Sequence, residues 1–313
     1  MKLHCPGIER NDTGGGSSFL RNFAKAMGSH AVQIVPTVEE CDILFIAGAS
    51  LSDRGIAEKA KELGKAIVLR VDNILEDSKN RNTGMPRMID FASWADVIIY
   101  QSKWAERLLM PHCGAGIVIY NGVDTDIFYP RKEAKDWENK RFIYSKFSRG
   151  EGKNFNVVQY WWREHNLKNS EDLLFLAGRF SDEIRNINHP FEFHNDEQVD
   201  YRGVLEPEQM AELLRQCDYA ILPYFADACS NTILEAQACG VPVLYNHSGG
   251  TPEIVSYGEE LSFEHEDILE MCDSQVFNFE EFKHEWGLEP MGRKYYALFT
   301  TVLAPEIETE ITL

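Results

Sequence analysis

Positive charge is scarce in this 313-residue chain, which has 31 lysines and arginines against 50 aspartates and glutamates, a formal net charge of −19. Nucleic acids and anionic membrane surfaces bind basic faces, so this charge balance argues against both as partners. No run of 18 apolar residues occurs, and the opening stretch "MKLHCPGIERND" has no hydrophobic signal core. We therefore expect a cytoplasmic protein without a strong membrane signal.

Paired cysteines at metal-binding spacing are also missing. The seven cysteines include no C-x-x-C pair, and Cys217, Cys229 and Cys239 are spaced neither as zinc ligands nor as a secreted disulfide framework. Free, buried thiols in a reducing compartment are the better interpretation. The "DTD" at 124–126 matches a manganese-binding Asp-x-Asp pair, but in "YNGVDTDIFYP" it is typical of a turn after a strand. The sequence thus predicts no metal site and no cofactor.

Short apolar runs alternate with helical patterns through most of the chain, which predicts βαβ units and parallel sheets. The chain is also longer than one hydrophobic core usually grows. We therefore expect an α/β fold with two Rossmann-like, doubly wound domains that face a central cleft. The expected strands form two groups, at 41–48, 66–72, 95–102 and 116–122, and at 141–147, 172–178, 199–205, 218–224 and 241–246.

The charged, poorly periodic segment "RKEAKDWENK" lies between the two groups of strands and is typical of a linker. We place an N-terminal Rossmann-like domain at 1–128 and a C-terminal one at 129–289. The C-terminal helical segment, about 290–313, is expected to pack back on the N-terminal domain. A hinge at 121–140 would let the cleft close and exclude water.

Three glycines precede a predicted helix in "NDTGGGSSFLRNFAKAM", whose start Ser17 or Ser18 is placed to cap. Glycines let the backbone approach a ligand closely, and the N–H groups of a first helical turn suit phosphate. The spacing matches neither the dinucleotide-binding G-x-G-x-x-G motif nor a P-loop. A flexible loop without a ligand remains an alternative interpretation of these residues alone.

Three cations, Lys146, Arg149 and Lys153, lie within eight residues in "YSKFSRGEGKN", at the carboxyl end of a predicted strand. In so acidic a chain, this grouping favours a diphosphate ligand. A solvated basic loop is the alternative.

The stretch "DACSNTILEAQACGVPVLYNHSGGTPE" at 227–253 runs from a loop into a predicted helix. Thr232 and Glu235 satisfy the capping-box pattern, which would explain Glu235 without any ligand. Asp227 lies upstream in the loop, where capping does not explain it. Carboxylates accept hydrogen bonds from sugar hydroxyls, while helix-start N–H groups suit phosphate. A nucleotide sugar presents both kinds of group.

Taken together, these segments resemble the retaining glycosyltransferases of family 4, which have the glycosyltransferase-B fold. The family's signature is an E-x7-E pair within "E-x-x-P-N-x-x-L-E-A-x-A-C-G-x-P-V", followed by "G-G-x-x-E". The chain has Asp227 at the first acid and matches the signature at Glu235, Ala236, Ala238, Gly240, Pro242, Val243, Gly249, Gly250 and Glu253. "YNGVDTDIFYP" and "QSKWAERLL" are similar to the family's hinge segment and the stretch before it. The resemblance spans roughly 66–260 and the glycine loop, and it is specific for fold and nucleotide-sugar use but not for substrate.

The resemblance implies that 1–128 is the acceptor domain and 129–289 the nucleotide-sugar donor domain, and it implies roles for single residues of the latter. Glu235 would bind the ribose hydroxyls, and Asp227 would contact the donor sugar near the reaction centre. Ser230 and Asn231 lie at the helix start, where backbone N–H groups would meet the diphosphate. Lys153 matches the family's phosphate-binding lysine.

Other positions match the family less directly. The arginine that accompanies the family's lysine corresponds here to Lys146 or Arg149. Gly14 and Gly15 match a glycine pair that closes on the phosphates. Many members have a histidine near the donor sugar where this chain has Asp72, and Asp227 is one methylene shorter than the usual glutamate.

The implied activity is transfer of a hexose-type sugar from a UDP-sugar or GDP-sugar to a glycan or other hydroxyl-bearing acceptor, with retention and without a metal. Lys153, the other cations and the helix start would stabilise the leaving diphosphate. A catalytically weakened nucleotide-sugar-binding protein and a sugar-nucleotide epimerase of similar fold remain alternatives. A glycoside hydrolase using Asp227 and Glu235 is disfavoured, because helix-start N–H groups lower a carboxyl pKa where a catalytic acid needs it raised.

Overall fold

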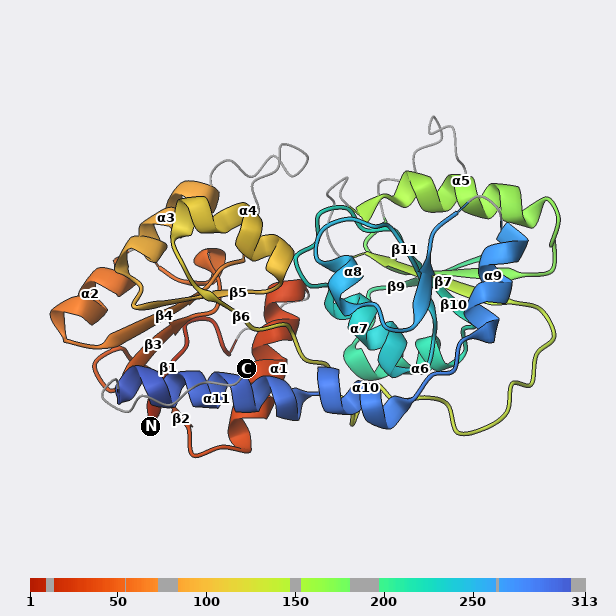
Figure 1. The fold of residues 1–313 in the computed structure, drawn as a ribbon. Coiled ribbons are helices and arrows are strands. Elements are labelled where there is room, and N and C mark those ends of the chain that lie inside the picture. The colour runs from red at the N-terminus through yellow and green to blue at the C-terminus, as the bar shows by residue number, and fades with distance from the viewer. Residues whose placement is uncertain are drawn as a thin grey trace. The chain divides into compact units, whose positions relative to one another are not determined.

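The structure, a computed structural model, describes residues 1–9, 14–53, 55–72, 84–146, 153–180, 197–262 and 265–304. The chain divides into two compact units, unit 1 (Met1–Gly122 with His284–Leu313) and unit 2 (Val123–Lys283). Each unit contains a six-stranded sheet with helices along it (Figure 1). Every described strand pairing is parallel, so the predicted α/β class with parallel sheets is confirmed.

Unit 1 has the strand order β2-β1-β3-β4-β5-β6. Its strands are β1 (Lys2–His4), β2 (Gln33–Ile34), β3 (Ile43–Ile46), β4 (Ala66–Arg70), β5 (Val97–Tyr100) and β6 (Ile117–Val118). Its helices are α1 (Gly15–Gly28), the 3-10 helix η1 (Ala49–Leu51), α2 (Ile56–Glu62), α3 (Gly84–Trp94), α4 (Lys103–Cys113) and α11 (Leu288–Leu303).

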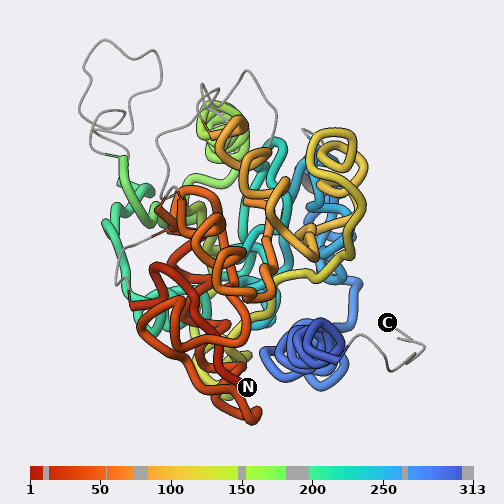
Figure 2. The backbone as a smooth tube through the Cα atoms, turned by 90° about the vertical axis from the view of Figure 1, so that its left-hand side faces the viewer, coloured from red at the N-terminus to blue at the C-terminus, as the bar shows by residue number. Residues whose placement is uncertain are grey.

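Both faces of this sheet are buried, as β3 shows. Successive strand residues point to opposite faces. Ile43 and Phe45 pack in the cluster formed with α1 and α11, where the ring of Phe45 lies 5.5 Å from that of Tyr295. Leu44 and Ile46 pack on the other face, with α2, α3 and α4. Figures 1 and 2 accordingly show α11 on the opposite side of the sheet from α3 and α4.

Unit 2 has the strand order β12-β11-β10-β7-β8-β9. Its strands are β7 (Arg141–Lys146), β8 (Leu173–Gly178), β9 (Val199–Gly203), β10 (Tyr219–Leu222), β11 (Val243–Tyr245) and β12 (Gly258–Glu260). Its helices are α5 (Phe155–Asn166), α6 (Pro207–Arg215), α7 (Asn231–Ala238), α8 (Thr251–Ile254) and α9 (His265–Ser274), while α10 (Phe279–Trp286) crosses from unit 2 into unit 1 along the chain.

The strand order of unit 2 positions the candidate site. β7 and β10 are hydrogen-bonded neighbours, with Phe142 opposite Tyr219. Because the two strands are parallel, the loops that follow them leave the same edge of the sheet. Ligands of open α/β sheets bind at this carboxyl edge.

Three short strands, β1, β2 and β12, were not expected from the sequence. β1 has one buried residue in three, both residues of β2 are exposed, and β12 reads Gly-Glu-Glu. Such strands lack the apolar run that marks a buried strand, since β2 and β12 are sheet edges. In the described part of the chain, no helix combines the length and apolar character needed to cross a bilayer.

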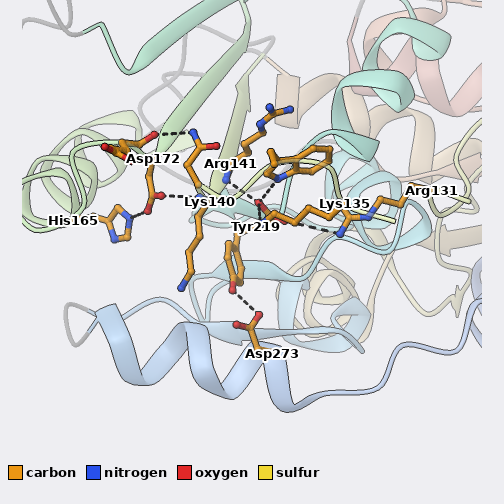
Figure 3. A network of polar contacts seen from close by, with 12 residues as sticks. Arg131, Lys135, Lys140, Arg141, His165, Asp172, Tyr219 and Asp273 are labelled. Carbon is orange, nitrogen blue, oxygen red and sulfur yellow. Dashed lines mark hydrogen bonds and ion pairs between the residues drawn. The ribbon is translucent and has the colours of Figure 1, made fainter. Parts of the chain in front are cut away.

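The predicted linker at 131–140 has no helix or strand and is attached to unit 2 (Figure 3). Asp218, just before β10, accepts hydrogen bonds at one carboxylate oxygen from Trp137 Nε1 at 2.9 Å and from Lys135 Nζ at 3.1 Å. The same oxygen accepts one from the backbone N–H of Arg141 at 2.9 Å. These contacts hold the segment at the amino ends of β7 and β10, away from the carboxyl edge where the candidate site lies.

Candidate functional site

Two predicted site residues meet beyond the carboxyl ends of β7 and β10. The Nζ atom of Lys153 lies 2.8 Å from Oδ2 of Asp227, and the two side chains are 22% and 23% exposed. Burial lowers the pKa of Lys153, but the charge and hydrogen bond of Asp227 outweigh it and raise that pKa above its usual value. The lysine is therefore a stable cation, partly shielded from water yet accessible to a ligand.

Hydrogen bonds to β7 and to the residue that follows β10 fix the backbone around Lys153. Tyr144, on β7, donates a hydrogen bond from its OH group to the carbonyl of Lys153 at 2.8 Å. Asn154 has a left-handed φ of 51°, which asparagine tolerates better than most residues, and its Nδ2 donates to the carbonyl of Pro223 at 2.8 Å. Lys153 is thereby attached to the ends of both β7 and β10.

The loop that carries Asp227 is held by the Gly-Gly turn of "HSGGTPE". The N–H of Ala226, which has a left-handed φ of 49°, donates to Ser248 Oγ at 3.0 Å. The N–H of Gly250 donates to the carbonyl of Asp227 at 2.8 Å. A Cβ atom on Gly249, whose φ is +69°, would lie 2.4 Å from that carbonyl oxygen. The second half of the motif therefore supports the position of its first acid.

The other predicted cations of this loop differ in their surroundings. Lys146, the last residue of β7, is buried, and its Nζ lies 5.3 Å and 5.2 Å from the ring centroids of Phe155 and Phe180. Lys146 thus borders the site from within the core of unit 2. Arg149 lies outside the described residues.

The predicted capping box at the start of α7 is wrong. The helix begins at Asn231, with Ser230 as its N-cap residue and no side-chain capping bond, so Thr232 is already inside the first turn. A capping box needs its glutamate at the third helical position, whereas Glu235 is the fifth. Glu235 therefore has a position, in the early turns of a helix at the carboxyl edge, that capping does not explain.

In unit 1, the predicted glycine loop leads directly into α1. The helix begins at Gly15 and its N-cap is Gly14, so the prediction that Ser17 or Ser18 caps it is wrong. Gly14 has a φ of +142°, which requires glycine. A Cβ atom at Gly14 or Gly15 would meet no atom of the described residues within 4 Å.

Asp72, also in unit 1, has hydrogen-bond partners at the start of η1. Its Oδ1 accepts a hydrogen bond from the N–H of Ala49 at 3.0 Å, and its Oδ2 accepts one from Ser50 Oγ at 3.2 Å, at the start of η1. A Cβ atom on Gly48 would lie 2.4 Å from Oδ2. Burial raises the pKa of the Asp72 carboxyl more than these hydrogen bonds lower it. The carboxylate thus caps η1.

The segment 124–126 is the turn that the sequence predicts. Asp124 Oδ1 accepts the N–H of Asp126 at 3.1 Å, and its carbonyl accepts the N–H of Phe128 at 2.9 Å. Within the described ranges, no three His, Cys, Asp or Glu side chains are grouped to hold a metal ion.

The sequence reasoning missed the residues that orient Lys153. Tyr144 hydrogen-bonds the carbonyl of Lys153, Asn154 is the next residue along the chain, and the ring of Tyr224 lies against the ammonium group. Tyr144 and Asn154 are the end residues of the stretch "YSKFSRGEGKN", but no role was predicted for any of these three residues. Two of them are aromatic residues at strand ends, which are indistinguishable in sequence from ordinary core residues.

Comparison with known proteins finds similarity to glycosyltransferases. Residues 158–275 match the family model of the glycosyl transferases group 1. No curated protein matches the chain in sequence. Among solved structures, Anabaena HepE in complex with UDP and glucose is 15% identical, with a TM-score of 0.73 over 96% of this chain and 99% of that one.

Two further solved structures share the fold over nearly their whole length. The sucrose-phosphate synthase of Thermosynechococcus elongatus is 13% identical, with a TM-score of 0.72 over 97% of this chain and 100% of that one. A glycosyltransferase from Rickettsia africae is 15% identical, with a TM-score of 0.63 over 97% and 98%. Residues 158–275 are therefore similar to the glycosyl transferases group 1, and the chain has the glycosyltransferase-B fold.

Proposed function

We propose that this glycosyltransferase moves a sugar from a nucleoside diphosphate sugar to a hydroxyl group of a glycan or other acceptor, with retention and without a metal ion. The observation that carries the proposal is the 2.8 Å contact between Lys153 and Asp227 beyond two neighbouring parallel strands. An ammonium group there suits a diphosphate, and a carboxylate suits the hydroxyls of a sugar.

UDP-glucose is the first donor to test. HepE, which shares the fold, was solved with UDP-glucose, and Staphylococcus aureus TarM was solved with UDP. A GDP-sugar is the second choice. In this proposal Glu235 binds the ribose, the N–H groups at Ser230 and Asn231 meet the diphosphate, and Gly14 and Gly15 are further ligands of the donor.

The chemistry follows from the charge that develops on the leaving group. The acceptor oxygen bonds to the anomeric carbon on the face from which the diphosphate leaves, and the acceptor proton passes to a phosphate oxygen. Lys153, together with Lys146 or Arg149 and the start of α7, stabilises the negative charge of the departing diphosphate in the place of a metal. Fixed charges in a partly dry site are effective because they need little reorganisation.

Asp227 has two successive partners in this scheme. Lys153 exchanges the Asp227 carboxylate for a phosphate oxygen when the donor binds. The released carboxylate then accepts a hydrogen bond from a sugar hydroxyl, which orients the anomeric carbon.

The proposal is tested by incubating the protein with UDP-glucose and a panel of sugar and glycan acceptors, with and without EDTA. We expect UDP release, an α-linked product by proton NMR, and no effect of EDTA. Lys153→Ala should lower the rate about 10²- to 10³-fold. Lys168→Ala, at an exposed lysine of the same unit, is the matched control.

Other outcomes separate the alternatives. A β-linked product overturns retention, and loss of activity in EDTA that Mn²⁺ restores overturns metal independence. Conversion of the donor sugar without an acceptor indicates an epimerase. UDP binding without turnover on any acceptor indicates a catalytically weakened binding protein.

A further inference from the structure

An aromatic ring lies against the ammonium group of Lys153. The ring centroid of Tyr224 is 3.5 Å from Nζ, well within the roughly 6 Å range of cation–π contacts. Tyr224 is buried, and its OH group donates a hydrogen bond to the carbonyl of Ser145 at 2.5 Å. The ring is therefore fixed in its orientation at the end of β10.

Neighbouring rings pack against Tyr224. Tyr144 contacts it edge to face, with ring centroids 6.4 Å apart, and itself stacks on Phe155 at 5.3 Å. Because the Tyr144 OH group also bonds the carbonyl of Lys153, one aromatic cluster fixes both the backbone and the ammonium group of this lysine.

Asp227 and Tyr224 hold the ammonium group in different ways. The carboxylate neutralises the charge of Lys153 and competes with any anion for it. The ring attracts the cation through its quadrupole and leaves the positive charge unneutralised. A phosphate that displaces Asp227 would therefore meet an ammonium group that Tyr224 still holds in position.

We propose that Tyr224 is a positioning residue that, through the face of its ring, holds the Lys153 ammonium group for the diphosphate of the donor. The inference rests on the proposed function, since it concerns the same donor site. It assigns a function to a side chain that is otherwise part of the core.

The test compares the affinities of UDP and uridine by titration calorimetry. Uridine lacks the diphosphate, so its affinity reports only on base and ribose contacts and on the integrity of the site. The proteins are wild type, Tyr224→Phe, Tyr224→Leu, Lys153→Ala and the double variant Lys153→Ala/Tyr224→Leu. The ratio of the two affinities isolates what the diphosphate contributes.

We expect Tyr224→Leu to weaken UDP binding about 3- to 30-fold and to leave uridine binding unchanged. Tyr224→Phe keeps the ring and should stay within about twofold of wild type. In the Lys153→Ala background, Tyr224→Leu should change UDP affinity by less than about twofold, because the two residues act as one unit.

Tyr219→Leu is the matched control. Tyr219 is a buried tyrosine at the other end of β10, and its OH group bonds Asp273. The Tyr219→Leu variant should have a lower melting temperature than wild type but the same ratio of UDP to uridine affinity. Where Tyr224→Leu does not fold, replacing Tyr224 with pentafluorophenylalanine keeps the shape of the ring and reverses its quadrupole, and UDP binding should weaken relative to Tyr224→Phe.

Four results would overturn the inference. Two of them would mean that the ring only supports the fold: equal losses of affinity for UDP and uridine, or an effect of Tyr224→Leu on UDP affinity that persists without Lys153. Neither result would contradict the proposed donor site. Equal UDP binding by the phenylalanine and pentafluorophenylalanine proteins would exclude the cation–π contact. If wild type binds UDP no more tightly than uridine, the proposed donor site fails and this inference fails with it.

Discussion

Asp72 and Asp227 occupy similar places in two similar units, since each follows the carboxyl end of a parallel strand, yet their carboxylates have different partners. Asp72 accepts hydrogen bonds from the N–H of Ala49 and the hydroxyl of Ser50 at the start of η1. Asp227 contacts the charged end of a lysine side chain, Nζ of Lys153.

The partner of a carboxylate, and not its place at a strand end, therefore decides whether it is available to bind a ligand. A carboxylate bound to a backbone N–H is part of the local fold, because losing that partner leaves a buried donor unsatisfied. A carboxylate bound to an ammonium group can exchange it for a ligand. On this ground Asp227 is the better candidate for contact with a substrate.

The largest expected effect concerns turnover. Asp227→Asn should lower the rate of sugar transfer from UDP-glucose about 10²- to 10³-fold, because it removes the charge that pairs with Lys153 and orients the sugar. Asp72→Asn should lower the same rate about tenfold or less, because the amide oxygen of the asparagine still accepts the N–H of Ala49. Initial rates of UDP release measure both, and a larger loss for Asp72→Asn would reverse the comparison.

Alanine substitutions test whether the Gly-Gly turn holds Asp227 in place. A Cβ atom at Gly249 would lie 2.4 Å from the carbonyl oxygen of Asp227, at a φ of +69°. Gly203 has nearly the same φ, +70°, and no atom of the described part of the chain lies within 4 Å of its Cβ position. Gly203→Ala should therefore cost about 1 kcal/mol of unfolding free energy for strain alone.

Gly249→Ala should cost about 2 to 3 kcal/mol more than Gly203→Ala, because backbone must also shift. It should also lower turnover, which Gly203→Ala should not. Urea unfolding and initial rates provide the two readouts. Equal stability losses in the two variants would show that the loop gives way freely and that Gly249 does not hold Asp227.

A third aspartate, at the opposite end of β10 from Asp227, sharpens the comparison. Asp218→Ala removes the acceptor shared by Trp137, Lys135 and the N–H of Arg141, and should cost about 2 kcal/mol of unfolding free energy. Asp200→Ala, which removes an exposed pair with Arg202, should cost less than about 0.5 kcal/mol. Urea unfolding measures both. A cost for Asp218→Ala no larger than that control would show that the linker contacts are dispensable.

The smallest expected effect is a pH dependence at Asp72. Its pKa is raised in the folded protein by burial, so the folded state binds a proton more readily than the unfolded state. The contribution of Asp72 to stability therefore falls as pH rises from the usual aspartate range through the raised pKa. Urea unfolding of wild type and Asp72→Asn from pH 3.5 to 7 should show stability rising less steeply with pH in wild type. A steeper rise in wild type would mean that the hydrogen bonds, and not burial, dominate.

Much of the fold was accessible from local pattern. Strands such as β3 and β8 are buried on both faces, so they read as unbroken apolar runs, whereas the polar edge strand β12 carried no signal. Helix starts were harder. At α1 and α7, residues with capping propensity lie inside the helix, because a glycine or serine further upstream begins it.

The two α/β halves and the segments that border the candidate site were predictable from the sequence alone, because apolar runs, helix periodicity and glycine turns are properties of neighbouring residues. Only the tertiary structure decided which partner each charged side chain takes. Lys153 and Asp227 are 74 residues apart and meet because β7 and β10 are neighbours in the sheet. Tyr224 lies against the same ammonium group for the same reason. Strand order, and not distance along the chain, brings such groups within a few ångströms of one another.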